Sequence, residues 1–468
     1  MTDTSGRSAA EKTLRHAFRG ALLADGDTGY DAARAIWNAM HDRRPALIAQ
    51  CRDAADVSAA VRYAAAAGLG VTVRGGGHNV AGTAVADGAV MIDLSRLRDV
   101  DVDPVAATAD AGGGCLLRDL DAATLAHGLA CPSGVVSHTG LGGLALGGGY
   151  GWLARKWGLT CDHLISAEVV LADGSVVRAS ADEHPDLYWA LRGGGGNLGI
   201  VTRFRLRLRP VGPVHQHTGV WPLAQAAQAL QAYREFAVAQ PADLHTVGAL
   251  KIAGRQEWVP AEVRGAPALF LTAAWFGDPA SGPAHTNPLF ERVPPAAEVR
   301  QTMSYATLQA LGDHSEPHGN RYFTKSCYLS ELTSGAIAQL LGAAADVRSS
   351  RSSIDFEYLR GAIAETPDDA TAFPRRDAPY ICTVSAQWTD VAEDAGNIEW
   401  TRESVDRLRD WQHGGAYVNY LQDEPPGKVR EVYGESRYAR LSALKDRYDP
   451  TDLLTGNRNV STTVATFQ

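Results

Sequence analysis

Apolar residues follow two different periods along the first third of the chain, and each period predicts an element. Alanine and valine recur at helical spacing from Asp53 to Gly70, which predicts a helix with a glycine cap. Residues 71–73 form a short β-branched strand, and residues 89–97 predict another strand that ends in a turn. Residues 107–129 then predict a strand, a glycine turn and an amphipathic helix, in that order.

A predicted hairpin and a long predicted strand complete the first part of the chain. Residues 167–180 hold two apolar runs around Asp173-Gly174, a dipeptide favoured at hairpin turns. Residues 199–210 alternate apolar and basic side chains, which predicts a strand with one solvated face. Prolines at 210 and 213 end this strand, so we place a domain boundary after residue 212.

The rest of the chain predicts a second domain and a separate last segment. Four apolar strands indicate one mainly antiparallel sheet, and two helices are expected to cover one of its faces. The strands lie in residues 245–254, 267–277, 352–365 and 378–388, and the helices in residues 331–347 and 400–412. Residues 431–454 predict a single amphipathic helix that Asp449-Pro450 ends.

Composition narrows the class of protein without locating a site. The chain has 468 residues, which suits two or three domains. It has 44 lysines and arginines against 53 aspartates and glutamates, a net charge of −9, which argues against nucleic acid or anionic membranes as main partners. No apolar stretch reaches the roughly 18 residues of a membrane span. The N-terminus shows no export pattern, so a cytoplasmic protein is expected.

No metal site is expected from the cysteines or histidines. The six cysteines are scattered, without a CxxC pair or the spacing of zinc ligands. His215-x-His217 is the only close histidine pair of note in the sequence, and no third ligand accompanies it.

Clusters of glycine between residues 70 and 200 are the first indication of a ligand. Three glycines in a row, at 75–77, expose consecutive N–H groups that can form a nest for a pyrophosphate. The loop Arg74–Asn79 is neither a P-loop nor a Rossmann turn, because GxxxxGK[ST] is missing and no helix follows directly. By itself the run also fits a flexible turn, and His78 also fits a structural role.

A second block of motifs changes that balance. It reads PSGVVSHTGLGG from residue 132, then LGGGYGW, RKWGLT with Asp162, and RGGGGNLGIVT. The C-terminal part adds YVNY from Tyr417, Lys445-x-x-Tyr448-Asp449-Pro450, and NRNV at 457–460. Together these motifs resemble the berberine-bridge-enzyme-like flavoproteins of the vanillyl-alcohol-oxidase superfamily. The resemblance covers nearly the whole chain, strongly at both ends and more loosely between residues 213 and 350.

The resemblance implies an α+β fold of two domains that binds FAD. Residues 1–212 would form the FAD-binding domain, with a PCMH-type core from about residue 40, and residues 425–468 would return to it. Residues 213–424 would form the substrate domain, whose sheet covers the flavin ring. The Arg74–Asn79 loop would hold the pyrophosphate, and His78 would bond covalently to the 8α-methyl group of the flavin.

The resemblance also carries a set of cofactor-binding positions onto this chain. They are Arg74, Gly75, Gly76, Gly77, His78, Asn79, Gly82, Val136, His138, Thr139, Gly140, Gly142, Gly143, Gly147, Gly148, Gly149, Tyr150, Trp152, Leu159, Asp162, Gly199, Ile200, Val201, Tyr417, Asn419, Tyr420, Asn457 and Asn459. Val136 is a departure, because many relatives have a cysteine there that forms a second bond to the flavin. Cys131 lies too early in the loop to replace it, so a single covalent link is expected.

The resemblance does not identify a general base, because the position that holds a carboxylate in some relatives matches Thr383, and threonine cannot serve as one. Four side chains are candidates for a catalytic role: Tyr150, Tyr420, Asp355 and Glu357. The two carboxylates share one face of a predicted strand. Tyr150 would need a cation to lower its pKa, and Arg155 and Lys156 are near in sequence. Packing of Tyr150 on the flavin and a solvated acidic strand face remain alternatives.

The expected function is that of a covalent FAD oxidase. A hydride would pass from an alcohol or amine carbon of a small or secondary-metabolite substrate to flavin N5, and a base would take the proton. O2 would then reoxidise the flavin and give H2O2. A dehydrogenase with another acceptor, an oxygenating enzyme of polyketide metabolism and a flavin-binding protein without catalysis are the alternatives. A monomer or homodimer is expected.

Overall fold

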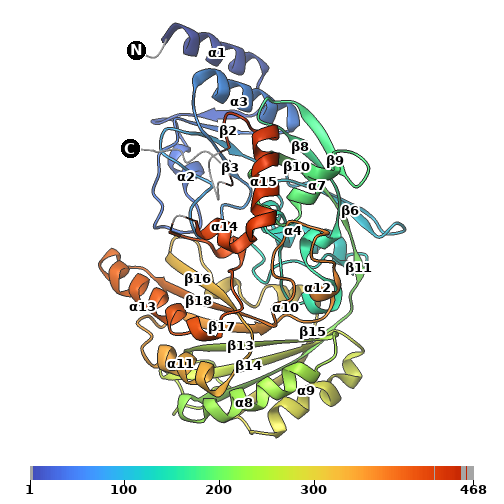
Figure 1. Ribbon diagram of the computed structural model, residues 1–468, viewed down its shortest axis with the longest axis vertical. Helices are drawn as coiled ribbons and strands as arrows, with labels where there is room; N and C mark the ends of the chain where they lie inside the picture. The colour runs from blue at the N-terminus through green and yellow to red at the C-terminus, as the bar shows by residue number, and fades with distance from the viewer. Residues whose placement is uncertain (1–3, 426, 455–459, 461–468) are drawn as a thin grey trace.

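The sheets fall into an upper and a lower group (Figure 1). The computed structural model describes residues 4–425, 427–454 and 460. In the upper group, one sheet has the order β1 (Ala21–Leu23), β2 (Leu47–Gln50), β4 (Val90–Asp93), β3 (Val71–Arg74). A second sheet has the order β5 (Val100–Asp103), β6 (Thr108–Gly112), β10 (Ile200–Arg207), β8 (Leu164–Val170), β9 (Val176–Ser180). A short ribbon pairs β7 (Leu129–Ala130) with β11 (Arg209–Pro210).

A β-α-β unit in the first sheet delivers the chain to the Arg74–Asn79 loop. Strands β2 and β3 both pair in parallel with β4, and α3 (Ala54–Ala67) connects them. Asp53 caps α3 by accepting a hydrogen bond from Asp56 N, and Gly68 ends it with φ 65°. The predicted helix and strand are therefore confirmed, and β3 ends directly at Arg74.

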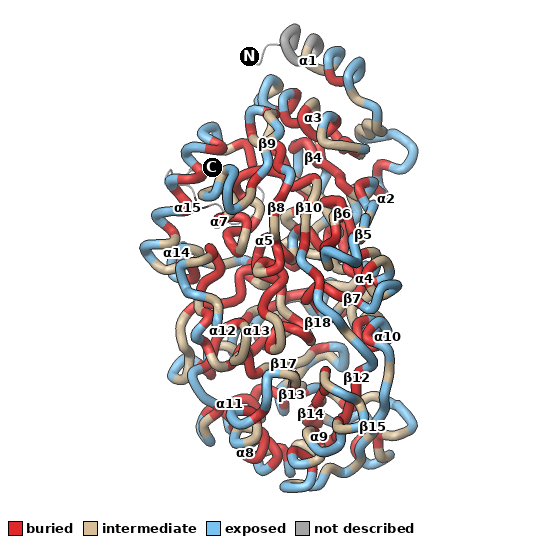
Figure 2. The backbone as a smooth tube through the Cα atoms, turned by 90° about the vertical axis from the view of Figure 1, so that its right-hand side faces the viewer, coloured by how far each residue is buried: buried red, intermediate tan, exposed pale blue. Residues whose placement is uncertain are grey.

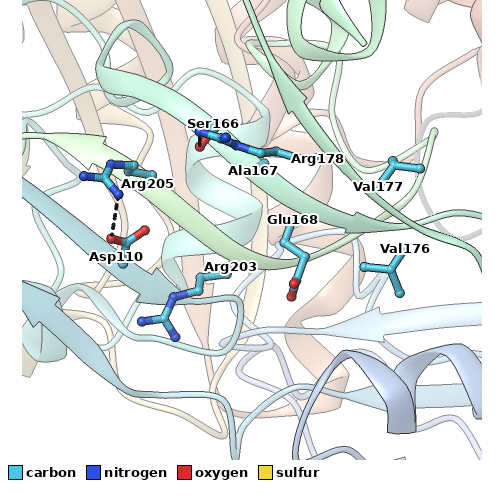
Figure 3. Close-up of a pocket in the computed structure, with 9 residues that line it drawn as sticks. All are labelled: Asp110, Ser166, Ala167, Glu168, Val176, Val177, Arg178, Arg203 and Arg205. Carbon is cyan, nitrogen blue, oxygen red and sulfur yellow. Dashed lines mark hydrogen bonds and ion pairs between the residues drawn. The ribbon is translucent and has the colours of Figure 1, made fainter. Parts of the chain in front are cut away.

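The second sheet has one buried and one open face. Phe204 and Leu206 of β10 are fully buried, whereas Arg203 and Arg205, which alternate with them, are partly exposed. Figure 3 shows the open face, where charged side chains from β6, β8, β9 and β10 surround a hollow of about 400 Å³. Arg205 pairs there with Asp110 of β6 at 3.4 Å. The predicted hairpin β8–β9 and the predicted half-solvated strand β10 are both confirmed.

The lower group is one antiparallel sheet that presents two different faces. Its order is β15 (Ala297–Met303), β12 (Val214–Pro222), β14 (Pro267–Trp275), β13 (Leu244–Ile252), β17 (Ser353–Tyr358), β18 (Tyr380–Trp388), β16 (Arg321–Leu329). One face is apolar and is covered by four helices (Figure 1): α8 (Leu223–Ala239), α9 (Gly282–Glu291), α11 (Ser334–Ala345) and α13 (Asp394–Asp406). The alternating register places Thr272, Asp355, Glu357 and Thr383 on the other face.

The last segment returns to the upper group, but as two helices instead of the single predicted one. They are α14 (Lys428–Tyr433) and α15 (Glu435–Tyr448). Gly434 separates them because it has φ 74°, a left-handed value that does not continue a helix. Leu441 of α15 is fully buried in the core of the second sheet, and Leu453 O accepts a hydrogen bond from Val71 N at the start of β3.

Buried residues continue through the middle of the molecule, between the upper sheets and the lower sheet (Figure 2). One apolar cluster there joins Leu159 and Tyr417 to Tyr328 and Ile381 of the lower sheet. Arg155, itself buried, donates hydrogen bonds to the backbone oxygens of Leu244 (2.9 Å) and Arg360 (2.6 Å). The two groups of sheets thus share one packed interface.

The remaining helices are short, apart from α1 at the start of the described chain. They are α1 (Thr4–Ala17), α2 (Tyr30–Arg34), α4 (Leu117–Leu125), α5 (Leu141–Leu146), α6 (Ala154–Trp157), α7 (Pro185–Leu191), α10 (Tyr305–Gln309) and α12 (Ala362–Glu365). The predicted strand β6 and helix α4 are confirmed, whereas α13 lies earlier than the predicted 400–412. None of the described helices is long and apolar enough to cross a membrane.

Candidate active site

Three glycine loops meet beside His78, at the ends of β3 and β6 and at the start of α5. A Cβ on Gly76 would lie 2.4 Å from Gly140 N, and one on Gly140 would lie 2.3 Å from Gly76 N. A Cβ on Gly142 would lie 3.0 Å from Gly113 O. Side chains would push these loops apart, so glycine is required for the backbones to approach. Gly113 was not among the predicted site residues, although its glycine run was visible in the sequence.

His78 is held against an aromatic ring and keeps one nitrogen without a partner. Its imidazole stacks on Trp37, with ring centroids 4.2 Å apart and planes 16° apart. Its Nε2 is buried and has no hydrogen-bond partner among the described residues. Burial lowers the pKa of His78 to about 3, and the neighbouring His138 and His318 add to this effect. The imidazole is therefore neutral, which is the form that can act as a nucleophile.

Two further histidines surround His78. The His138 ring centroid lies 4.9 Å from that of His78, and the His318 centroid lies 5.1 Å from that of His138. His138 and Thr139 belong to a turn in which Thr139 N donates to Val136 O at 3.1 Å. The loop that carries Val136 is thereby placed next to His78.

Cys131 does not share this position. Its side chain is fully buried in the apolar core of the second sheet, among residues such as Leu120 and Leu141. Burial raises the pKa of the Cys131 thiol, with a smaller contribution from the Asp121 carboxyl, so the thiolate is disfavoured.

Three tyrosines form a second cluster, at the junction of the upper and lower sheets. The Tyr417 ring centroid lies 4.9 Å from that of Tyr150 and 5.0 Å from that of Tyr420. The Tyr417 hydroxyl accepts hydrogen bonds from Gly149 N (3.0 Å) and Asn419 Nδ2 (2.9 Å), so it braces the glycine turn 147–149. Tyr150 and Tyr420 are hydrogen-bonded to each other through their hydroxyls.

The sequence left open whether Arg155 or Lys156 lowers the pKa of Tyr150, and neither does so in the structure. Burial raises the pKa of Tyr150 well above its usual value, and Tyr420 and Glu357 raise it further. Arg155 is occupied by backbone oxygens, and Lys156 bonds Phe276 O (2.7 Å) and pairs with Asp243 (2.9 Å). The phenol of Tyr150 therefore stays protonated, so it can donate and relay a proton but does not begin as a base.

Carboxylates of the lower sheet approach the tyrosines from the other side. The charge of the Glu357 carboxylate adds to burial in raising the pKa values of Tyr150 and Tyr420. It also bonds His245 Nε2 at 2.8 Å. Burial raises the pKa of Asp355, although a hydrogen bond from Ser353 Oγ at 2.5 Å opposes this.

Glu316 joins these groups and was not predicted from the sequence. It lies in the connection from α10 to β16, and its backbone oxygen accepts a hydrogen bond from Trp37 Nε1 at 2.9 Å. Burial raises the pKa of Glu316 to about 8; the Asp355 carboxylate adds to the shift and Lys251 opposes it. The connection has no motif or periodicity that could have marked this residue.

Several predicted cofactor positions have structural roles in the fold. Asp162 binds Arg376 at 2.6 Å and accepts a hydrogen bond from Leu159 N at 2.9 Å. Gly82 packs against the His41 ring. The remaining positions in this group belong to strand packing, loop turns or backbone contacts: Arg74, Asn79, Gly199, Ile200 and Val201. Asn457 and Asn459 lie outside the described residues.

A Glu316→Gln variant should become more stable than the wild type at high pH. A carboxyl group whose pKa is raised in the folded state stabilises the protein while it is protonated, and this contribution is lost as the pH rises through about 8. Glutamine keeps the neutral form at every pH. Melting temperatures of the two proteins should therefore agree at pH 5 and differ at pH 9. An equal fall in both melting temperatures between these values contradicts the burial of Glu316.

Two family models match the chain, and their descriptions agree with the two ends of the site. One, described as FAD binding domain, matches residues 45–180, and the other, described as Berberine and berberine like, matches residues 416–461. (R)-6-hydroxynicotine oxidase of Paenarthrobacter nicotinovorans is 30% identical over 455 residues, which cover 95% of this chain and 97% of that protein.

Solved structures share the whole fold. 6-Hydroxy-D-nicotine oxidase from Arthrobacter nicotinovorans superposes with a TM-score of 0.82 at 27% identity, covering 95% of this chain and 98% of that one. Glucooligosaccharide oxidase from Acremonium strictum, described with 6-S-cysteinyl, 8α-N1-histidyl FAD, has a TM-score of 0.84 at 25% identity. That alignment covers 97% of this chain and 99% of the glucooligosaccharide oxidase chain.

The fold and the glycine-lined site define an FAD-linked oxidoreductase with the two-domain α+β fold of the vanillyl-alcohol-oxidase type, as the motifs predicted. Within this class, the chain belongs to the berberine-bridge-enzyme-like family. Its residues suit FAD, because a buried imidazole nitrogen without a partner faces loops that only glycine allows to meet.

Proposed function

We propose that this protein is an FAD oxidase whose flavin is bonded to His78 alone. The observation that carries the proposal is the neutral His78 imidazole, whose buried Nε2 has no partner among the described residues and which lies beside the converging glycine loops. Val136 stands at the position of the second bond, and Cys131 is buried elsewhere with a raised pKa. In this proposal residues 1–212 and 425–468 bind FAD, and residues 213–424 bind the substrate.

When bound, FAD supplies the acceptor for two electrons from the substrate and returns them to oxygen. The side chains of this protein orient the substrate and move its proton. Tyr150 and Tyr420 hold each other by a hydrogen bond, and the charge of Glu357 adds to burial in raising the pKa values of both. A substrate O–H or N–H that bonds to Tyr150 can pass its proton along the tyrosine pair toward Glu357.

The polar face of the lower sheet supports a small alcohol or amine as substrate. Thr218 and Thr272 bond each other there at 3.0 Å, and Thr324 and Ser385 at 2.9 Å. Hydroxyl groups can exchange such bonds for bonds to a polar substrate, while Glu357 and Glu316 provide acceptors for its donors. The relatives act in line with this chemistry, since one is named for 6-hydroxynicotine and another for glucooligosaccharides.

Oxygen consumption tests the oxidase assignment directly. A panel of alcohols and amines is supplied to the purified protein in air, and O2 uptake and H2O2 are measured for each compound that reduces the flavin. Equal amounts of O2 consumed and H2O2 formed are expected. Reduction in air without O2 uptake would instead establish a dehydrogenase, and label from ¹⁸O2 in the product would establish an oxygenating enzyme.

His78→Ala should abolish covalent attachment of the flavin. Acid precipitation of the wild type is expected to give a yellow pellet with flavin mass on the peptide that carries residue 78, whereas the variant leaves its flavin in the supernatant. Cys131→Ser is the matched control, because the thiol is buried away from His78 and its loss should leave the pellet yellow. Flavin retained by the His78→Ala pellet places the bond on another residue.

A further inference from the structure

We propose that His138 is the base that removes the proton from the 8α-methyl group of FAD when the bond to His78 forms. The inference rests on the proposed His78 bond and concerns a different residue and a different step. It starts from a second imidazole beside His78 that the oxidase chemistry does not use. The centroid of the His138 ring lies 4.9 Å from that of His78, so a carbon bonded to a ring nitrogen of His78 is within reach of this second imidazole.

One nitrogen of His138 is free to accept a proton. Nδ1 of His138 is buried and has no hydrogen-bond partner among the described residues. Burial lowers the pKa of His138, but the Asp313 backbone oxygen acts to raise it, which is the effect of a carbonyl that accepts from a ring N–H. The proposed step uses the tautomer in which Nε2 carries the hydrogen and Nδ1 keeps its lone pair, because a base needs a lone pair at the unpartnered nitrogen.

Asp313 is itself fixed to the loop that carries His138. Ser137 N and Ser137 Oγ donate to its two carboxylate oxygens, at 2.7 and 2.6 Å. Gln309 of the same connection donates to Gly134 O at 3.0 Å and to Ser133 Oγ at 3.1 Å. The connection after α10 thus clamps residues 133–138, which holds the His138 ring in place beside His78.

The surroundings of His138 keep its imidazole neutral, which is the form that can accept a proton. Burial lowers the pKa of His138, and Arg118 lowers it further. The Asp313 carboxylate and the bond to the Asp313 backbone oxygen act in the opposite direction. The rings of His78 and His318 also lie beside His138, with centroids 4.9 and 5.1 Å from its own.

The other neighbours are less suited to this step. The His318 ring is exposed and its centroid lies 6.3 Å from that of His78, farther than the ring of His138. Cys131 is buried in a core cluster with a raised pKa. The Asp313 carboxylate is committed to Ser137. Among these groups His138 alone combines a short distance to His78 with a buried nitrogen that has no partner in the described part of the chain.

The step balances with O2 as the only further reactant. A C–H bond of the 8α-methyl group breaks and its proton passes to Nδ1 of His138, while the electron pair enters the flavin ring. A nitrogen of His78 then bonds to the 8α carbon and loses its own proton. Both protons and the electron pair end on the flavin, which is then reduced by two electrons. O2 takes them up as H2O2 and returns the flavin to its oxidised form.

The test measures attachment and not turnover. Wild type, His138→Gln and His318→Gln are purified after expression with limiting riboflavin and incubated with excess FAD. Acid precipitation at intervals gives the fraction of chains with bound flavin, and flavin fluorescence before precipitation gives total FAD bound. We expect His138→Gln to bind FAD but to attach it at a rate about 10²-fold below that of the wild type, as for removal of a general base. His318→Gln should attach FAD at the wild-type rate.

A second variant distinguishes a base from a packing residue. His138→Ala leaves space beside His78, and added imidazole should restore its attachment rate in proportion to imidazole concentration, which a merely structural role would not do. His138→Gln attaching at the wild-type rate, failure of imidazole to accelerate folded, FAD-binding His138→Ala, or equal slowing by His318→Gln overturns the assignment to His138. A wild type without acid-stable flavin overturns the His78 bond, and this inference with it.

Discussion

Replacing Lys445 with methionine should lower the free energy of unfolding by about 3–5 kcal/mol, the range for breaking a buried ion pair by removing one partner. Lys445 and Asp449 are both 1% exposed. Lys445 Nζ lies 2.6 Å from Asp449 Oδ2 and donates to Asn197 O and Leu454 O, each at 3.1 Å. Methionine fills similar space but leaves the Asp449 carboxylate without its cation and two backbone oxygens without a donor.

The effect should reach the FAD-binding loop. The Asp449 carboxylate also accepts hydrogen bonds from Leu453 N and Leu454 N, each at 2.8 Å, and Leu453 O bonds to Val71 N at the start of β3. Strand β3 ends in the Arg74–Asn79 loop. Loss of Lys445 is therefore expected to weaken FAD retention as well as stability.

Urea unfolding of the two proteins, followed by tryptophan fluorescence, measures the first effect. Lys428→Met is the matched control, because Lys428 forms an ion pair at 2.7 Å with Glu431, whose side chain is 56% exposed. Exposed pairs of this kind contribute only about 0–1 kcal/mol. If Lys445→Met costs no more than Lys428→Met, the buried pair does not stabilise the return of α15 to the upper sheets.

Local sequence patterns were sufficient to predict the elements that carry their own capping residues or turn residues. Helix α3 has a capping Asp53 and a terminal glycine, and the hairpin β8–β9 turns at Asp173-Gly174. Helix α14–α15 was predicted as continuous because helical spacing runs through Gly434, and only its backbone angle shows the break. The predicted elements are those whose stabilising contacts are near in sequence.

Strands β12 and β16 of the lower sheet had no usable pattern, and their position explains why. Strand β16 has apolar side chains on the helix face, such as Phe323, but Thr324 and Ser326 toward the candidate site. Strand β12 is buried along nearly its whole length, yet contains His215 and His217. A strand that lines a polar site does not alternate between apolar and exposed residues, so it is missed for the same reason that it is functional.

The candidate site divides in the same way. The His78 loop and the tyrosine motifs were found because they are contiguous in sequence. Trp37 and Glu316 were not, because they are joined by a hydrogen bond between residues 279 positions apart and neither belongs to a motif. Contacts of this kind depend on the packing of the lower sheet against the upper sheets and become visible only in the folded structure.

Tyr150→Phe should slow reduction of the flavin by the substrate about 10²–10⁴-fold, the usual contribution of a positioned proton-transfer group. The Tyr150 hydroxyl is hydrogen-bonded to Tyr420, and its raised pKa keeps it protonated. It can therefore take the substrate proton only as it passes its own proton to Tyr420. Phenylalanine retains the ring that packs on Tyr417, so FAD binding should change little. Stopped-flow reduction without oxygen gives the rate, and flavin absorbance gives the content of FAD.

Tyr420→Phe distinguishes a relay from a single essential hydroxyl. If the proton passes from Tyr150 through Tyr420 toward Glu357, both single variants should be slow and the double variant only slightly slower, because groups that act as one unit are not additive. Tyr188→Phe is the matched control, since its hydroxyl donates to Leu164 O at 2.6 Å in the upper group and should leave the reduction rate unchanged. If Tyr150→Phe reduces the flavin as fast as Tyr188→Phe, Tyr150 has only a packing role. If the fold-losses in reduction rate of the two single variants multiply in the double variant, the two hydroxyls act independently.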